Sequence, residues 1–137
     1  ITYLQSIKTT ALYTSPQPSE LAEIPQVPLN FETYQKGRSI FGTYCKGCHG
    51  YVGNGKGVAG HLLLPEPRDF TDAVWMSKQT DRYLFSIITK GKSNTAMPAY
   101  EDTFSPVEIA SVLKYIKLFS DPITRQRMEL PLRDNNR

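Results

Sequence analysis

Two cysteines and a histidine stand together in residues 43–57, which read TYCKGCHGYVGNGKG. Cys45 and Cys48 are separated by two residues, His49 follows at once, and the chain of 137 residues has no third cysteine. Thiols and an imidazole at this spacing can form a disulfide, exchange disulfides, bind a metal ion or attach a cofactor. The spacing and the type of fold around the motif separate these uses.

Three of these uses fit the sequence poorly. A disulfide between Cys45 and Cys48 would close too short a loop to constrain the unfolded chain much. Disulfide exchange by a C-x-x-C motif is typical of thioredoxin-like α/β folds, and no segment of this chain reads as a strand. A structural zinc site needs four ligands, and the adjacent side chains of Cys48 and His49 cannot easily turn to one tetrahedral ion. The attachment of a cofactor remains.

The C-x-x-C-H pattern is the signature of covalent attachment of a c-type haem. Two intervening residues in a helical turn set the sulfurs at the two vinyl groups of the haem, and the next residue points its imidazole at the iron. The motif uses both cysteines of a small chain, which makes the match more specific than in a large protein. The sequence therefore predicts one haem c, bound through Cys45 and Cys48, with His49 as an iron ligand.

The other face of the iron needs a second ligand, unless it stays open. Met97 is the preferred candidate because it lies in the loop NTAMPAY between two expected helices, where Pro98 stiffens the backbone that presents its sulfur. Ligation by a histidine and a methionine raises the reduction potential relative to two nitrogen donors, and it leaves no open site for a substrate. This pattern favours an electron carrier over an enzyme. The less favoured ligands are His61, Met76, Lys90, Lys92 and Met128.

The elements that must position these residues are expected to be helices, because apolar and aromatic side chains recur at helical spacing and no segment alternates like a strand. Asn30 is a predicted N-cap of the first helix, and Ser105 followed by a proline is a predicted start of the last. The predicted fold class is all-α. The expected helices lie at about residues 30–45, 72–76, 80–90 and 105–119.

Length and composition indicate one domain with additions at both ends. The chain has 39% hydrophobic residues, enough for one ordinary core at this length. Residues 1–30 are punctuated by prolines without helical or strand period, and we expect an extended N-terminal arm there. Residues 31–120 form the predicted domain, and residues 121–137 are expected to be a charged C-terminal tail at its surface.

Charge and hydropathy exclude several classes of partner. Lys and Arg number 16 against 13 Asp and Glu, and a formal net charge of +3 is too small to predict nucleic-acid binding. No run of about 18 to 20 apolar residues predicts a transmembrane segment. The sequence given starts with Ile1, which would suit an exported protein whose signal peptide has been cleaved.

The motifs taken together resemble the class I (mitochondrial-type) monohaem cytochromes c, particularly the bacterial periplasmic ones. Those proteins often combine C-x-x-C-H-G, a G-x-G-x-G loop, PRDF and a later G…MP, which here are residues 45–50, 53–57, 67–70 and 91–98. The resemblance covers roughly residues 31–120. It implies a cytochrome c fold of three to five helices around one covalently bound haem, with the extended N-terminal arm outside it.

The resemblance also implies roles for single residues. Gly37 and Phe41 on the first helix are expected to meet Tyr115 on the last, where these two helices cross. A proline carbonyl is expected to orient His49, with Pro67 preferred over Pro65. The residues similar to those that bind the haem propionates are Arg68 and Trp75. The expected wall of the haem crevice consists of Leu62, Leu64, Phe70, Leu84, Ile88 and Tyr100.

The function that the resemblance implies is electron transfer without enzymatic activity, in a bacterial periplasm. Four lysines near the expected haem edge, Lys46, Lys56, Lys90 and Lys92, are expected to face an acidic surface of a redox protein partner. Two alternatives stay open. The chain could be a haem c subunit bound within a larger respiratory oxidoreductase complex, or, less favoured, a gas- or peroxide-handling haem protein in which Met97 is displaced.

Overall fold

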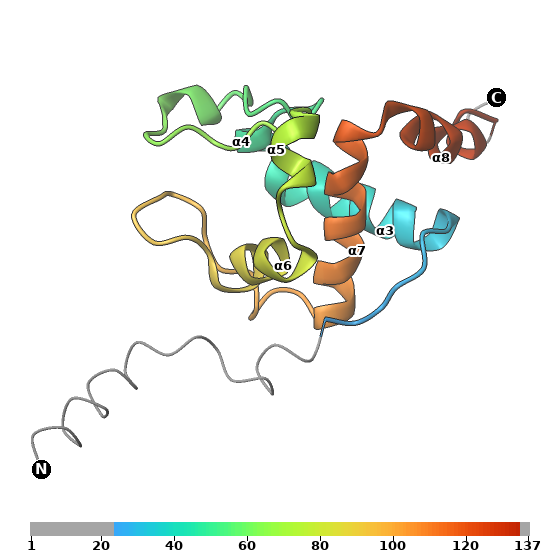
Figure 1. The fold of residues 1–137 in the computed structure, drawn as a ribbon, viewed down its shortest axis with the longest axis horizontal. Coiled ribbons are helices and arrows are strands. Elements are labelled where there is room, and N and C mark those ends of the chain that lie inside the picture. The colour runs from blue at the N-terminus through green and yellow to red at the C-terminus, as the bar shows by residue number, and fades with distance from the viewer. Residues whose placement is uncertain (1–23, 135–137) are drawn as a thin grey trace, which may run out of the picture.

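The computed structural model describes residues 24–134, and these residues form helices joined by long loops without any strand (Figure 1). The prediction of an all-α fold is confirmed. The expected N-terminal arm falls mostly on residues 1–23, which lie outside the described residues. The elements are α3 (Phe31–Ile40), the π-helix η1 (Phe41–Cys45), α4 (Lys46–His49), the 3₁₀ turn η2 (Gly60–Leu62), α5 (Ala73–Ser77), α6 (Asp81–Lys90), α7 (Pro106–Lys117), the 3₁₀ turn η3 (Leu118–Ser120) and α8 (Pro122–Asp134).

Short polar side chains start the helices where the sequence predicted them. Asn30 caps α3 by accepting a hydrogen bond from the Thr33 N–H at 3.0 Å, and the Thr33 hydroxyl accepts one from the Asn30 N–H. Asp72 caps α5 and Thr80 caps α6 in the same way. Each cap satisfies an N–H group that the first turn of a helix leaves without a partner.

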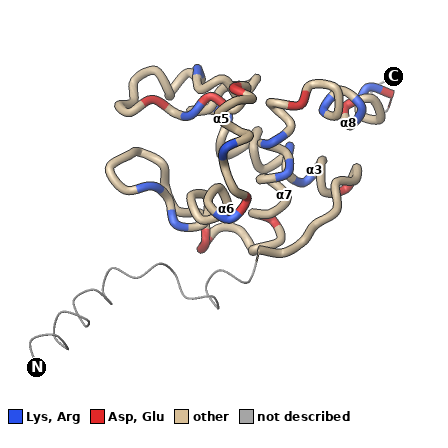
Figure 2. The backbone as a smooth tube through the Cα atoms, in the orientation of Figure 1, with Lys and Arg blue, Asp and Glu red and all other residues tan. Residues whose placement is uncertain are grey.

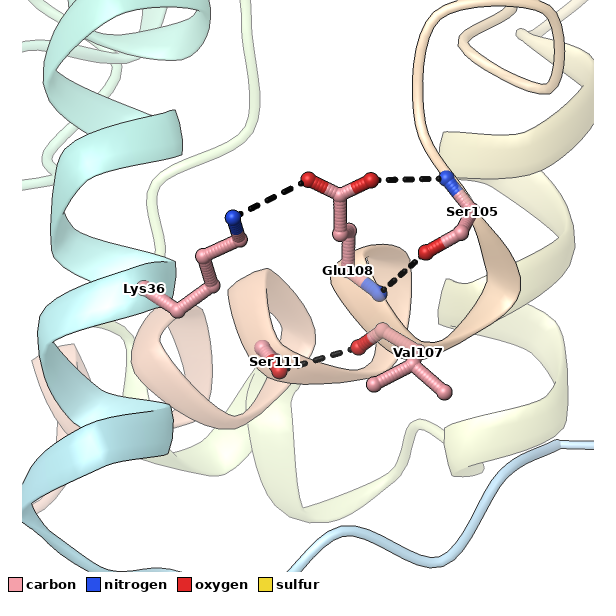
Figure 3. Close-up of polar contacts among 5 residues, drawn as sticks. All are labelled: Lys36, Ser105, Val107, Glu108 and Ser111. Atoms are coloured by element: carbon pink, nitrogen blue, oxygen red, sulfur yellow. Dashed lines mark hydrogen bonds and ion pairs between the residues drawn. The ribbon is translucent and has the colours of Figure 1, made fainter.

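The start of α7 is a reciprocal capping box that is tied to α3 (Figure 3). The Ser105 hydroxyl accepts from the Glu108 N–H at 3.2 Å, and the Glu108 carboxylate accepts from the Ser105 N–H at 3.1 Å. The other carboxylate oxygen of Glu108 lies 3.3 Å from the ammonium group of Lys36 on α3. One turn further on, the Ser111 hydroxyl donates to the Val107 carbonyl at 2.9 Å. The first turn of α7 is therefore fixed to α3 as well as to itself.

Helices α3 and α7 approach each other most closely at Gly37. A Cβ atom added at Gly37 would lie 2.5 Å from the Ser111 carbonyl oxygen and 2.8 Å from Cβ of Tyr115. Such distances are shorter than any side chain tolerates, so only glycine permits this approach. The predicted contact of Gly37 and Phe41 with Tyr115 is present, because the rings of Phe41 and Tyr115 lie 5.3 Å apart.

The core is centred on α7, which contributes more of its buried side chains than any other element. Tyr34 and Phe41 from the first helical segment pack on Tyr115, and Phe41 packs on Phe119 with ring centres 5.0 Å apart. Phe70 joins this group from the loop before α5. The aromatic cluster thus connects η1, which leads to Cys45, with α7 and with the loop before α5.

The segment expected to be a charged tail forms the helix α8, which was not among the predicted helices. Asp121 accepts from the Thr124 N–H at 3.2 Å and caps this helix, with Pro122 as its first residue. From α8, Glu129 accepts a hydrogen bond from the buried Tyr34 hydroxyl and pairs with Arg38 at 3.4 Å. These contacts hold α8 against α3. Within residues 24–134, no helix has the length and apolar character needed to cross a membrane.

Candidate haem-binding site

The two cysteines lie on either side of a change in helical geometry. Helix α3 runs directly into the π-helix η1, where the Lys46 N–H donates to the Phe41 carbonyl five residues back. Cys45 ends η1, and α4 then carries Cys48. Both cysteines are free thiols, both are half-buried, and both line the same cavity. Single π-helical turns inside α-helices often occur at functional sites, and this one sets the angle at which the motif leaves α3.

The cavity beside the cysteines has a volume of about 200 Å³ and is bounded mostly by carbon atoms. His49 and Met97 line it together with the two cysteines. An apolar cavity does not hold water well, and this one has two thiols, one imidazole and one thioether in its wall. That set of groups fits a c-type haem, with an apolar macrocycle and an iron that takes nitrogen and sulfur ligands. The apolar wall includes Leu63, Phe70, Leu84, Ile87, Ile88, Val112, Leu113 and Ile116.

The imidazole of His49 is held in one orientation from two sides. Its Nδ1 lies 3.2 Å from the carbonyl oxygen of Arg68, and its ring stacks on Phe70 with centres 4.4 Å apart. Because a carbonyl can only accept, Nδ1 carries the proton and donates, which leaves Nε2 with a free lone pair. Burial lowers the pKa of His49, while the hydrogen bond to Arg68 acts in the opposite direction. The imidazole is therefore kept neutral, which is the form that binds a metal.

The prediction that the Pro67 carbonyl orients His49 is wrong, because the next carbonyl along the chain does so. The Pro67 carbonyl instead faces the glycine loop, where a Cβ atom added at Gly55 would lie 2.5 Å from its oxygen. Gly55 has a φ of +80°, so the loop needs glycine there for its backbone angle as well as for space. Pro67 remains in the wall of the cavity. The Arg68 carbonyl, one residue further on, faces His49.

The environment of Cys45 does not suit thiolate chemistry. Burial and the neighbouring Cys48 raise the pKa of Cys45 to about 12, so the thiol stays protonated at neutral pH. A protonated thiol is a poor nucleophile in disulfide exchange and a poor zinc ligand. In the part of the chain that the structure describes, no group of three or more His, Cys, Asp and Glu could hold a metal ion.

The loop after α6 brings Met97 to the cavity. Gly91 ends α6 with a φ of +75°, and the loop then closes through hydrogen bonds from the Lys92 N–H to the Met97 carbonyl and from the Met97 N–H to the Thr95 hydroxyl. Figure 1 shows this loop, between α6 and α7, on the same side of the molecule as the loops near α4 and below them in this view. Met97 is half-buried and lines the same cavity as His49.

The competing ligands lie elsewhere or have other partners. Met76 is 6% exposed and packs in the core, and Met128 packs against the core from α8. His61 bonds to the Gly57 carbonyl at 3.2 Å and does not line the cavity. The ammonium of Lys90 pairs with Glu101 at 2.7 Å. Among these candidates only Lys92 also lines the cavity.

Arg68 and Trp75 lie together at the cavity. The guanidinium carbon of Arg68 lies 4.7 Å from the centre of the Trp75 ring, and both side chains are in the wall. The structure therefore brings together the two residues that the resemblance implied for the propionates. In this arrangement the Arg68 guanidinium and the Trp75 ring lie beside the same part of the cavity.

The crevice wall was predicted correctly at four of the six positions. Phe70, Leu84, Ile88 and Tyr100 line the cavity. Leu62 and Leu64 are 80% and 92% exposed, and Leu63 between them lines the cavity instead. The run LLLP at residues 62–65 does not indicate which leucine turns inward. The 3₁₀ turn Gly60–Leu62 just before Leu63 determines which side chain faces the cavity. Val112, Leu113 and Ile116 also line the cavity and were not among the predicted wall residues, although they lie on the last predicted helix.

Comparison with known proteins agrees with this geometry. The fold and the cysteine motif define a monohaem c-type cytochrome domain. A family model described as "Cytochrome C oxidase, cbb3-type, subunit III" matches residues 32–116, and the chain belongs to this family. Its cofactor is haem c, with Cys45 and Cys48 as the C-x-x-C cysteines. Domains of this kind transfer electrons and are typically non-enzymatic carriers.

Two relatives show how far the likeness extends. The chain is 27% identical over 104 residues to the quinohemoprotein alcohol dehydrogenase ADH IIB of Pseudomonas putida, and the match spans 74% of this chain but only 14% of that protein. The solved structure of the KustC0563 c-type cytochrome is 26% identical, with a TM-score of 0.53 over 61% of this chain and 95% of that one. The structure of a point mutant of the same cytochrome gives a TM-score of 0.54 at 27% identity, over 61% of this chain and 98% of that one. The prediction of a cytochrome c-like fold is confirmed.

Proposed function

We propose that this chain passes one electron at a time between redox protein partners through a single haem c whose iron has His49 and Met97 as axial ligands. The observation that carries this proposal is that both side chains line one apolar cavity, with the two cysteines beside them. When bound, the haem supplies an iron that exchanges one electron. The protein's own groups hold the ligands, exclude water and set the preference for one oxidation state.

The ligands are supported by contacts that restrict their movement. The Arg68 carbonyl and the Phe70 ring hold the His49 imidazole, and the hydrogen bonds of the loop at Thr95 hold the backbone of Met97. The hydroxyl of Tyr100 donates to the Tyr44 carbonyl at 3.2 Å, which ties the methionine loop to the cysteine segment. A rigid pair of ligands needs little rearrangement on electron transfer, and a neutral sulfur donor favours ferrous iron.

Arg68 and Trp75 are proposed to hold the haem propionates. Arg68 can pair with a carboxylate, and the Trp75 indole can donate a hydrogen bond to the same group. Their stacking at 4.7 Å fixes the guanidinium plane beside the cavity. Arg68 then acts twice, since its backbone carbonyl holds His49 and its side chain faces the propionates.

An acidic redox partner is proposed to dock where the haem edge is exposed. Lys92 lines the cavity, whereas Lys56 and Lys90 are paired with Glu66 and Glu101. Lys46, which was also predicted at this edge, lines a different cavity. Lys92 is therefore the lysine most directly available to a partner at this edge. Haem c is attached outside the cytoplasm, and we propose a bacterial periplasm as the compartment, reached through an export signal.

A second candidate is a haem domain within a larger oxidoreductase. The observation that favours it is that the match to the quinohemoprotein alcohol dehydrogenase covers 74% of this chain and 14% of that protein. The description of the family as an oxidase subunit points the same way. Size-exclusion chromatography of the protein from its native host separates the two, since a carrier elutes alone and a subunit elutes with its partners.

The experiment that tests the proposed ligation compares Met97→Ala with Met76→Leu. Met97→Ala removes the sulfur from the cavity, and we expect the weak sulfur-to-iron band of the oxidised spectrum to vanish, the potential to fall and carbon monoxide to bind promptly. Met76→Leu keeps a core side chain of similar volume and should leave all three readouts unchanged. A Met97→Ala protein with the wild-type band and potential, or prompt carbon monoxide binding by the wild type, contradicts the ligation.

A further inference from the structure

A second cavity lies away from the haem-binding site, between α3, η1 and α8. Its volume is about 1030 Å³, and it opens to solvent. Figure 1 shows α8 at the opposite end of the molecule from the methionine loop and from the loop that follows α4. Four cations line this groove, Arg38, Lys46, Arg125 and Arg133, against one carboxylate, Glu129. Figure 2 shows basic positions along α8.

The one carboxylate of the groove is already matched. Glu129 accepts a hydrogen bond from the Tyr34 hydroxyl and pairs with Arg38 Nε at 3.4 Å. Arg125 rests on the Phe119 ring with its guanidinium carbon 4.5 Å from the ring centre. Its buried Nε has no hydrogen-bond partner among residues 24–134. Buried donors without a partner are uncommon in folded proteins, and an acceptor on a bound segment would satisfy this one.

The remaining cations also lack counter-charges. Neither Lys46 nor Arg133 forms an ion pair with another residue in the described range 24–134. Lys46 comes from the cysteine segment and Arg133 from the far end of α8, so the two enter the groove from different elements. The groove therefore holds two cations, Lys46 and Arg133, that no described carboxylate pairs with, beside Arg125 and Arg38, which share the single carboxylate of Glu129.

The spacing of these cations points to an elongated ligand. Arg125 and Arg133 are eight residues apart on α8, which corresponds to about 12 Å along the helix axis. A ligand that engages both cations in place extends along the helix, which an isolated phosphate or carboxylate does not. A peptide segment with several acidic side chains does, and Gln126 and Thr43 add polar groups in the wall. Tyr51, which is 73% exposed at the groove, provides the kind of aromatic contact that protein interfaces favour.

We propose that this groove binds an acidic segment of a partner protein. The inference rests on the proposed function only in taking that partner to be a redox protein. Docking here leaves the cavity that holds His49 and Met97 uncovered, so one partner can be tethered while the haem edge exchanges electrons. The groove is therefore a second docking surface, separate from the one beside Lys92.

The test measures binding of a fluorescein-labelled heptaglutamate peptide to the haem-loaded 137-residue chain by fluorescence anisotropy at low salt. Arg133→Glu reverses an exposed charge in the groove, and Arg127→Glu makes the same change on α8 outside it. We expect Arg133→Glu to weaken binding about five- to tenfold and Arg127→Glu less than about twofold. Lys46→Glu and its control Lys78→Glu form a second pair with the same expected difference.

Several results would overturn the inference. One is a failure of the peptide to bind the wild-type chain, and another is equal weakening of binding by the two variants of each pair. Displacement of the peptide by inorganic phosphate at matched concentration, or tighter binding of a thymidine oligonucleotide than of the peptide, would also contradict it. The visible spectrum and the potential are measured on the same samples. These two readouts report on the proposed ligation, so a failure of the groove and a failure of the electron-transfer proposal are distinguishable.

Discussion

The closest contact between α3 and α7 can be tested by adding one methyl group. In Gly37→Ala the new Cβ would lie 2.5 Å from the Ser111 carbonyl oxygen, where ordinary contact begins near 3.4 Å. The obstructing atoms belong to the backbone of α7 and to Cβ of Tyr115, so no side-chain rotation can relieve the overlap. The two helices must therefore separate by almost 1 Å, and the packing of Tyr34 and Phe41 on Tyr115 is disturbed with them.

Two effects of opposite sign determine how much Gly37→Ala changes the free energy of unfolding. Alanine is a better helix former than glycine by about 1 kcal/mol, which stabilises the variant. Overpacking of a tight core costs about 1–3 kcal/mol, and the backbone contact places this site at the upper end. We expect Gly37→Ala to lower the free energy of unfolding by about 1–2 kcal/mol, with a fall in Tm of about 3–8 °C. Denaturant unfolding of the haem-loaded protein at constant m-value measures this change.

Gly42 offers the matched control, because it lies in the π-helix one turn later and a Cβ atom there meets nothing within 4 Å. Gly42→Ala should leave the stability unchanged or raise it by up to about 1 kcal/mol. If Gly37→Ala proves as stable as Gly42→Ala, the close approach of α3 and α7 is not the reason for glycine at this position.

Three further predictions concern the helix contacts. Ser105→Ala removes the cap of α7 and should lower the free energy of unfolding by about 1 kcal/mol, measured by denaturant titration. The Ser105 N–H and then Lys36 lower the pKa of Glu108 below 4.5, so its charge stabilises the fold above that pH and the benefit is lost as the pH falls through the lowered pKa. The stability difference between wild type and Glu108→Gln should therefore shrink from pH 7 to pH 3, and a constant difference contradicts this. Tyr34→Phe removes the hydroxyl that donates to Glu129 and should cost about 1–2 kcal/mol, whereas a neutral effect would show that the hydroxyl adds nothing.

The chemistry of the site was predictable because the residues that determine it lie close together in short segments of the sequence. Cys45, Cys48 and His49 lie within five consecutive residues, and the helical backbone of η1 and α4 brings all three to one cavity wall. Met97 could be selected because its loop separates two clear helices. Caps such as Asn30 act on their own first turn, so they too could be recognised locally.

The missed features depend on backbone paths that no local pattern determines. Whether Pro67 or Arg68 turns its carbonyl to His49 is decided by how the glycine loop packs beneath Pro67. The choice of Leu63 over its neighbours follows from the end of a 3₁₀ turn. Such choices follow from tertiary packing rather than from propensity.

Helix α8 was missed although a local signal existed. Asp121 followed by Pro122 repeats the order of cap and proline that Ser105 uses to start α7. Its many charged residues and Pro131, which lies inside α8, give it no clear apolar stripe of the kind that marks the other helices. The helix is stabilised by the contacts of Glu129 and Arg125 with the rest of the domain, and those partners are distant in the sequence.

The central claim is one haem held covalently by Cys45 and Cys48. Intact-mass spectrometry of the protein matured in its own host tests it most directly, with Cys45→Ala plus Cys48→Ala as the control. The account predicts the mass of the polypeptide plus one haem for the wild type, resistant to acid extraction, and the bare polypeptide for the control. A wild-type protein with the mass of the bare polypeptide would contradict it.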